Sequence, residues 1–258
     1  MSRMPVLCVV PLAKIRAHEK VDPLRVERLI GRFEEEGIQV NPMMCTEAPG
    51  GELVLLDGAT RTNALRSLGL EHAVVQLVDP EEVVLETWHH VVRDCDADEF
   101  LSDITETPEL ELAEDQWMPR LRMVDGSVHS VVGKDVSLNA ALAALVDSYV
   151  GIRSINRITD PSDDSVPWRF PDWVAVIEYP TLTVEDVIKA AVAVDLLPAG
   201  ITRFLVSERA LRLNLDLDLL RAPGPIADKQ VALESLLSSR AQSGRIRRYE
   251  ETVVILDD

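Results

Sequence analysis

The segment from Leu55 to Thr62, with the sequence LLDGATRT, has the residue types of an anion-binding site. An apolar run ends at Asp57, Gly58 turns the chain, and a helix then begins with free backbone N–H groups. A helix N-terminus attracts anions, and the guanidinium of Arg61 in the first turn adds a bidentate donor. Asp57 is a candidate for holding a metal ion or orienting an attacking group. Read alone, the pattern fits an Asp-Gly turn followed by a surface arginine equally well.

Glu19 is the candidate for accepting a proton. It follows His18 in a connector between the first expected strand and a capped helix, which places it at the mouth of an α/β sheet. Phosphoryl transfer to an alcohol needs a group that orients the hydroxyl and accepts its proton. The alternative for a glutamate in an acidic chain is a solvated surface residue.

Two further segments carry residues suited to binding a polar ligand. In the run ETWHH at 86–90, Trp88 is a candidate pocket wall and His90 a candidate hydrogen-bond donor to a polar ligand. A metal site is not indicated, because no third ligand is nearby. The alternative for Trp88 is packing in the core. In LPAGITRF at 197–204, Gly200 lets a ligand approach the backbone, and Thr202 and Arg203 together suit an amino-acid carboxylate. The alternative there is a helix-to-strand turn followed by an edge-strand arginine.

Hydrophobic spacing predicts the elements that position these residues. In the first ninety residues strands alternate with helices, the first helix having Asp22 as N-cap and Gly37 as C-cap, so the fold class is α/β. The expected strands there are 5–10, 43–46, 52–56 and 73–78, and the helices are 23–36 and 59–68.

The second half is also α/β in pattern. Acidic residues near 93–98 indicate a boundary, which gives two domains, 1–93 and 94–258. An Asp125-Gly126 turn indicates a hairpin, and residues 159–171 have the composition of a loop. The expected strands are 121–124, 127–132, 173–177, 201–206 and 251–256, and the helices are 137–150, 183–194 and 225–241.

Composition narrows the classes of function. The 258 residues include 44 acidic and 26 basic side chains, a net charge of −18 that disfavours nucleic acid as a partner, although Arg240, Arg245, Arg247 and Arg248 form one basic cluster. No run is apolar enough for a membrane span or signal peptide. The three cysteines are scattered without a metal or disulfide pattern, so we expect a reducing cytoplasm.

These segments, in this order, resemble the ParB/sulfiredoxin-like superfamily, and within it the free L-serine kinases, above all those of staphyloferrin B siderophore biosynthesis. The resemblance covers essentially the whole chain. It rests on His18-Glu19, the D-G-x-x-R turn at 57–61, T-W-x-H at 87–90, Ser148-Tyr149, P-A-G-x-T-R-F at 198–204, L-N-L at 213–215 and Y-x-E at 249–251. ParB proteins and sulfiredoxins lack the C-terminal segments.

The resemblance implies an enzyme that phosphorylates free L-serine to O-phospho-L-serine, with Mg²⁺ and either ATP or ADP as donor. Domain 1–93 would bind the nucleotide and domain 94–258 would supply the serine side. Glu19 would be the base and Asp57 a catalytic residue and metal ligand. The turn Gly58, Ala59, Thr60, Arg61 and Thr62 would hold the phosphates, and His18, Trp88, His90, Gly200, Thr202 and Arg203 would line the serine site.

Thr60 departs from the family turn, which carries histidine immediately before its arginine. A threonine hydroxyl can donate to phosphate or ligate Mg²⁺, but it does not carry a proton as imidazole does. The product would feed a specialised pathway to a siderophore or 2,3-diaminopropionate, with a PLP-dependent, cysteine-synthase-like enzyme as pathway partner. The sequence is compatible with a homodimer without requiring one.

Three other interpretations of the same sequence differ in class. A ParB-like, nucleotide-responsive transcriptional regulator would need a helix-turn-helix module and a basic face, and the sequence offers neither. A catalytically inactive ligand sensor is supported by Thr60. A sulfiredoxin-type reductase would need a cysteine in the turn, where Ala59 stands.

Overall fold

The first sheet of the computed structural model, which describes residues 4–113 and 118–249, has five strands in the order β1-β6-β4-β5-β2. Its parallel pairs are β4–β6 and β2–β5, and the other two pairs are antiparallel. The strands are β1 (Val6–Pro11), β2 (Ile15–Ala17), β4 (Met43–Glu47), β5 (Leu53–Asp57) and β6 (His72–Leu77).

Both faces of this sheet are covered, which explains why its strands are continuously apolar. Along β5, Leu53 and Leu55 face a core shared with α1 (Pro23–Glu36) and α2 (Ala59–Ser67), while Val54 and Leu56 face α6 (Val184–Ala193) and the rest of the chain. The C-terminal helices α7 (Leu217–Arg221) and α8 (Ile226–Gln242) return to the first core.

The second sheet has six antiparallel strands in the order β12-β8-β13-β10-β11-β9. Helices α3 (Ala97–Thr105) and α4 (Leu138–Asp147) share a core with one face, and α5 (Val166–Arg169) covers part of the other. The strands are β8 (His89–Arg93), β9 (Leu110–Ala113), β10 (Arg120–Met123), β11 (Val128–Gly133), β12 (Ser154–Ile158) and β13 (Trp173–Glu178).

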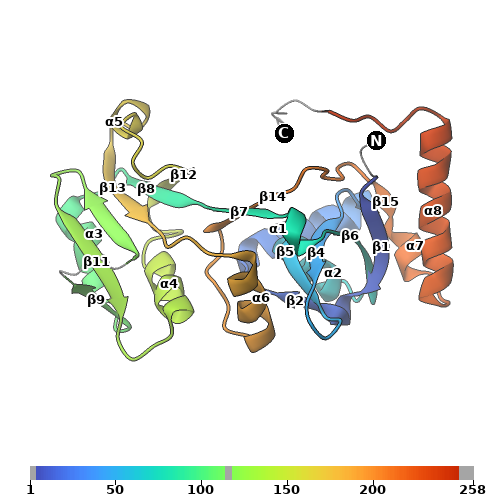
Figure 1. The fold of residues 1–258 in the computed structure, drawn as a ribbon, viewed down its shortest axis with the longest axis horizontal. Helices are drawn as coiled ribbons and strands as arrows, with labels where there is room; N and C mark the ends of the chain where they lie inside the picture. The colour runs from blue at the N-terminus through green and yellow to red at the C-terminus, as the bar shows by residue number, and fades with distance from the viewer. Residues whose placement is uncertain (1–3, 114–117, 250–258) are drawn as a thin grey trace.

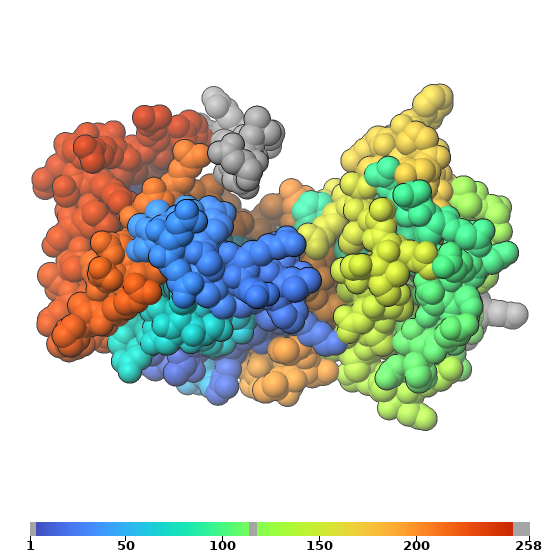
Figure 2. All heavy atoms as spheres, turned by 180° about the vertical axis from the view of Figure 1, so that it is seen from behind, coloured from blue at the N-terminus to red at the C-terminus, as the bar shows by residue number. Residues whose placement is uncertain are grey.

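The two sheets form two lobes joined by a narrow middle part (Figure 1). A two-stranded ribbon of β7 (Val84–Thr87) and β14 (Thr202–Leu205) crosses this middle part, and helix α6 lies beside it. Seen from behind, the surface is indented between the blue-to-cyan lobe and the green-to-yellow lobe (Figure 2). The remaining short elements are the pair β3 (Ile38–Gln39) and β15 (Leu215–Asp216), and the 3₁₀ turns Leu12–Lys14 and Pro80–Glu82.

The expected α/β fold class is confirmed, and so are the caps that were readable from sequence. The Asp22 carboxylate accepts a hydrogen bond from the Leu24 N–H, and Gly37 ends α1 in the left-handed conformation. A further cap lies at the start of α6, where Thr183 and Asp186 form a capping box.

The structure differs from the expected elements in two places. The expected loop 159–171 contains the short helix α5, whose Val166 is fully buried. The acidic stretch after residue 93 is not a linker, because Asp96 caps helix α3 there. The expected strand 251–256 lies outside the described residues.

The division into domains at residue 93 stays a prediction. Strand β8, which begins before residue 93, pairs within the second sheet, and helices α7 and α8 pack on the first sheet. No helix within the described ranges is long and apolar enough to cross a membrane.

Candidate functional site

The turn after β5 is built as a helix N-terminus with free donors. Gly58 caps α2 at φ 109°, and its carbonyl accepts hydrogen bonds from the Thr62 N–H (2.8 Å) and hydroxyl (3.0 Å). In the described part of the chain, the N–H groups of Ala59, Thr60 and Arg61 have no acceptor. Such a turn offers three backbone donors and the positive end of a helix dipole to an anion.

Gly58 is required here by space as well as by conformation. A Cβ at this position would lie 2.8 Å from Met43 Cγ and 2.9 Å from Arg61 Nη2. Arg61 folds back over the turn and donates through Nη2 to Asp57 Oδ2 at 2.7 Å. Its Nε is buried and has no hydrogen-bond partner among the residues described, so the guanidinium keeps a donor for a further acceptor.

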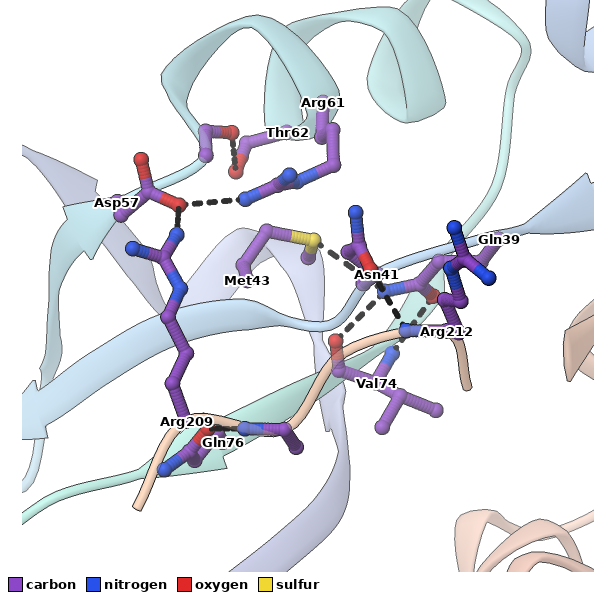
Figure 3. Close-up of polar contacts among 12 residues, drawn as sticks. Gln39, Asn41, Met43, Asp57, Arg61, Thr62, Val74, Gln76, Arg209 and Arg212 are labelled. Atoms are coloured by element: carbon purple, nitrogen blue, oxygen red, sulfur yellow. Dashed lines mark hydrogen bonds and ion pairs between the residues drawn. The ribbon is translucent and has the colours of Figure 1, made fainter. Parts of the chain in front are cut away.

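A second arginine, Arg209, reaches the same carboxylate from the other end of the sequence. Its Nη2 donates to Asp57 Oδ2, so that oxygen lies between the guanidinium groups of Arg61 and Arg209 (Figure 3). The segment that carries Arg209 is held by side-chain amides of the first lobe: Gln76 accepts from the Ala210 N–H, and Asn41 from the Arg212 N–H, both at 2.8 Å. Sequence reasoning missed Arg209, because no local motif marks it.

Glu19 lies between β2 and α1 and is tied to a segment that precedes β14. The Leu197 N–H donates to the His18 carbonyl (2.8 Å), and the Lys20 N–H donates to the Leu197 carbonyl (2.9 Å). The Gly200 N–H donates to Glu19 Oε2 at 3.4 Å. Residues nearly two hundred positions apart therefore meet at the Glu19 carboxylate.

Burial raises the pKa of Glu19 to about 7, with a smaller contribution from the negative charge of Asp57. The Gly200 N–H and the charges of Arg157 and Arg25 act in the opposite direction without cancelling the effect. The carboxyl therefore changes charge near neutral pH, as a general base must. His18, the neighbour of Glu19, contacts the Leu55 carbonyl at 2.6 Å, two residues before Asp57, so the glutamate and the anion-binding turn follow adjacent strands, β2 and β5.

His18 and His90 are buried and hold the backbone of the site. His18 Nδ1 donates to the Leu55 carbonyl (2.6 Å), which leaves Nε2 to accept from the Thr202 hydroxyl (3.3 Å). His90 Nε2 donates to the Gly200 carbonyl (3.2 Å), and its Nδ1 accepts from the Tyr149 hydroxyl (2.6 Å).

Burial also fixes the charge of the two histidines. It lowers the pKa of each imidazole to about 4, so both rings are neutral at pH 7. The hydroxyl of Tyr149 in turn is hydrogen-bonded to that of Tyr179. Each histidine thus joins segments of the site through fixed tautomers and does not carry a positive charge.

The structure separates two of the residues expected to act together. Thr202 and Arg203 are neighbours on β14, so their side chains point to opposite faces. Thr202 turns to His18, whereas Arg203 forms an ion pair with Glu86 (2.6 Å) and lies over the Trp88 ring, 4.7 Å from its centre. Trp88 and Arg203 therefore form their own cluster, with the positive charge of Arg203 already paired.

Gly200 is the meeting point of the second lobe with Glu19. Its φ is +87°, and a Cβ there would lie 2.1 Å from Nη2 of Arg157 on β12.

No group of three or more His, Cys, Asp or Glu side chains that could hold a metal is found within residues 4–113 and 118–249. A metal at this site would therefore have to rely on Asp57, on hydroxyl oxygens of the turn and on oxygens of a ligand.

Comparisons with known proteins agree with this architecture. No family model matches the chain. The chain is 25% identical to the ATP-dependent L-serine kinase SbnI of Staphylococcus aureus, over 95% of this chain and 97% of that protein. It is 30% identical to the ATP-dependent L-serine kinase of Staphylothermus marinus, over 34% of this chain and 35% of that protein.

Two solved structures share the fold over most of their length. C-terminally truncated SbnI from Staphylococcus aureus has a TM-score of 0.74 at 23% identity, covering 91% of this chain and 97% of that structure. A glutamate-to-glutamine variant of a free serine kinase in complex with AMP has a TM-score of 0.75 at 16% identity, covering 85% and 95%. Along nearly the full length of both sequence and fold, the chain is therefore similar to SbnI and the free serine kinases.

Proposed function

We propose that this protein is a kinase that transfers the terminal phosphoryl group of ATP to the hydroxyl of free L-serine, giving O-phospho-L-serine and ADP. The observation that carries the proposal is a half-buried glutamate, Glu19, with its pKa raised to about 7 and an anion-binding helix N-terminus beside it. The relatives named above are ATP-dependent L-serine kinases, which supports the choice of ATP over ADP.

In the proposed reaction Glu19 orients the serine hydroxyl and takes its proton. The hydroxyl oxygen forms a bond to the terminal phosphorus, the bond from that phosphorus to the bridging oxygen breaks, and ADP leaves with the electron pair. A base with a pKa near 7 is charged at physiological pH and remains basic enough to accept the proton.

The phosphates would be held by the turn at 58–61. Its three free N–H groups, the guanidinium of Arg61 and that of Arg209 offer donors and positive charge where negative charge accumulates. The Thr62 hydroxyl donates to the Gly58 carbonyl, so Thr62 supports the turn. The Thr60 hydroxyl is half-buried and makes no hydrogen bond with any described residue, which leaves it for the ligand.

The residues around Gly200 would form the serine side. Gly200 lets the substrate approach the backbone next to Glu19, and Thr202 presents its hydroxyl to His18 close by. His18 and His90 would position these groups from beneath. Trp88 and Arg203 would form the rim, because Arg203 points to the other face of β14 and lies over the Trp88 ring.

Mg²⁺ fits the donors at the turn. This ion is usually bound through one or two carboxylates together with substrate phosphates and waters. Asp57 is half-buried and uses only Oδ2 for its two arginines, so Oδ1 is open to a cation, and the Thr60 hydroxyl is a second oxygen donor. Asp57 and Thr60 would hold the ion, which would neutralise charge on the phosphates.

The product identifies the class of reaction that would consume it. O-Phospho-L-serine carries a good leaving group on its β-carbon, which suits a PLP-dependent, cysteine-synthase-like partner in a siderophore or 2,3-diaminopropionate pathway. The three cysteines are free thiols, which supports the proposal of a reducing compartment such as the cytoplasm. A homodimer remains part of the proposal without an interface assigned.

A regulator of the ParB type is not favoured. The net charge is −18, and Arg240 of the basic cluster donates to the Leu213 carbonyl at 2.5 Å, so its guanidinium caps a backbone segment. DNA binding needs a face of free basic side chains.

The deciding experiment incubates the protein with L-serine, Mg²⁺ and ATP, in parallel with ADP, and follows O-phosphoserine by ³¹P NMR. Glu19→Gln should abolish the product while leaving nucleotide binding intact, and Glu27→Gln, at an exposed glutamate on α1, should match the wild type. Nucleotide binding without product from the wild type would instead support an inactive sensor, and DNA binding at physiological salt would support a regulator.

A further inference from the structure

Arg157 lies on the Glu19 side of the site and has no hydrogen-bond or ion-pair partner among the residues described, although it is an arginine in a strongly acidic protein. It lies on β12, opposite His90 in the strand register. Other arginines around the site form ion pairs: Arg61 and Arg209 pair with Asp57, and Arg203 pairs with Glu86.

The position of Arg157 is fixed by its contact with Gly200. A Cβ on Gly200 would lie 2.1 Å from Arg157 Nη2 and 2.9 Å from its Cζ, so the guanidinium lies directly against the Gly200 backbone. The N–H of the same glycine donates to Glu19 Oε2 at 3.4 Å. Arg157 and Glu19 therefore flank one glycine, and their side chains do not close into an ion pair.

The charges around this gap favour an anion. Arg157 is exposed to solvent, and partial loss of hydration lowers the pKa of its guanidinium; the nearby positive charge of Arg25 acts in the same direction, while Glu19 acts against them. Arg25, in the first turn of α1, is exposed and makes no hydrogen bond within the described part of the chain. Two positive charges thus share one carboxyl that is partly protonated at neutral pH, and a second carboxylate would relieve their repulsion.

We propose that Arg157 binds the α-carboxylate of the amino-acid substrate, in place of Arg203. This inference rests on the proposed serine kinase activity. In L-serine two carbon atoms separate the hydroxyl oxygen from the carboxyl carbon, so a serine with its hydroxyl at Glu19 extends its carboxylate across the same gap. A guanidinium binds a carboxylate through two parallel hydrogen bonds.

This assignment also explains how the site selects a free amino acid. A serine within a peptide has no free α-carboxylate at that distance from its hydroxyl, and ethanolamine has none at all. Either molecule would leave the Arg157 guanidinium without an acceptor while filling the space in front of it. The selection would then be made by β12 of the second lobe, whereas the phosphates are bound by the first.

The test compares steady-state kinetics of the wild type, Arg157→Ala, Arg157→Lys and Arg203→Ala, with L-serine and with ethanolamine as acceptors. Arg157→Ala should raise KM for L-serine about 10- to 100-fold, the loss expected for one charge-assisted bidentate contact, with KM for ATP unchanged. The rate with ethanolamine should not fall, and added guanidinium ion should restore part of the activity with L-serine. Arg157→Lys should be intermediate.

Arg32→Ala is the matched control, because Arg32 is an exposed arginine paired only with Glu36 on α1. Far-ultraviolet circular dichroism and thermal melts establish that each variant is folded. An unchanged KM for L-serine in Arg157→Ala, or a rise seen only in Arg203→Ala, would overturn the inference and leave the kinase assignment standing. Absence of O-phosphoserine from the wild type would overturn both.

Discussion

Replacing Glu19 by glutamine should remove activity and raise stability at the same time. Glutamine has the same shape and still accepts the Gly200 N–H, but it carries no charge. The free energy of keeping this buried carboxyl ionised follows from its pKa, which burial raises from 4.5 to about 7. At about 1.4 kcal/mol for each pKa unit, the charge costs the folded state about 3 kcal/mol above pH 7.

The pH dependence has a definite sign. Below pH 4.5 the carboxyl is protonated in both the folded and the unfolded chain, and it costs nothing. As pH rises from 4.5 to about 7 the unfolded chain loses the proton while the folded chain keeps it, so the free energy of unfolding falls. Glu19→Gln should therefore be about 3 kcal/mol more stable than the wild type at pH 8 and nearly equal to it at pH 4.5.

Urea unfolding at the two pH values measures this difference, and the rate of O-phosphoserine formation gives the second readout. Loss of a general base should lower kcat about 10²- to 10⁴-fold. The wild-type rate should rise with pH up to about 7 and then level off. The control Glu27→Gln should change neither quantity. A stability difference of the same size at both pH values would show that the charge of Glu19 is not its cause, and the reasoning from burial would fail.

Three other changes test the phosphate side. Gly58→Ala should weaken ATP binding about tenfold or more and lower Tm, because φ is +109° and the new Cβ would lie 2.8 Å from Met43 Cγ. Gly37→Ala, also left-handed but with no atom within 4 Å, should lower Tm alone. Arg209→Ala should raise the Kd for ADP about tenfold by calorimetry, whereas Arg212→Ala, whose contact is made by its backbone, should not; equal values would contradict the role of Arg209. Removal of Mg²⁺ with EDTA should stop turnover, and MgCl₂ in excess should restore it.

Local sequence signals were sufficient to predict the helices and strands that flank the anion-binding turn and Glu19. Asp22 and Gly37 cap α1, and Gly58 ends β5 and begins α2, because each of these positions has its own requirement for a side-chain acceptor or a left-handed backbone. Glu19 could be found only through the resemblance to a family, since a lone glutamate in an acidic chain carries no distinguishing pattern.

The contacts that complete the site could not be predicted from local sequence. Asp57 pairs with Arg209 across 152 positions, and Arg203 pairs with Glu86 across 117. Such pairings depend on how the strands assemble. The local sequence around an arginine is the same whether or not a distant carboxylate will pair with it. The burial of His90 had one readable sign: the run VLETWHHVVR at 84–93 contains four β-branched residues, and it forms β7 and β8, with His90 on a strand that has a neighbour on each side.

The C-terminal half therefore does more than extend a nucleotide-binding domain. Gly200 touches Glu19, His90 fixes Gly200, and Arg157 lies against it, so three groups from beyond β7 determine the surroundings of a base that belongs to the first lobe. Burial is the largest cause of the raised pKa of Glu19, and the hydrogen bond from the Gly200 N–H acts against it. Without the second lobe the same glutamate would be more hydrated and a weaker base, beside a turn that still binds phosphate. In the proposed mechanism, the pairing of Leu197 with the backbone of His18 and Lys20 holds the segment that carries Gly200 against the base.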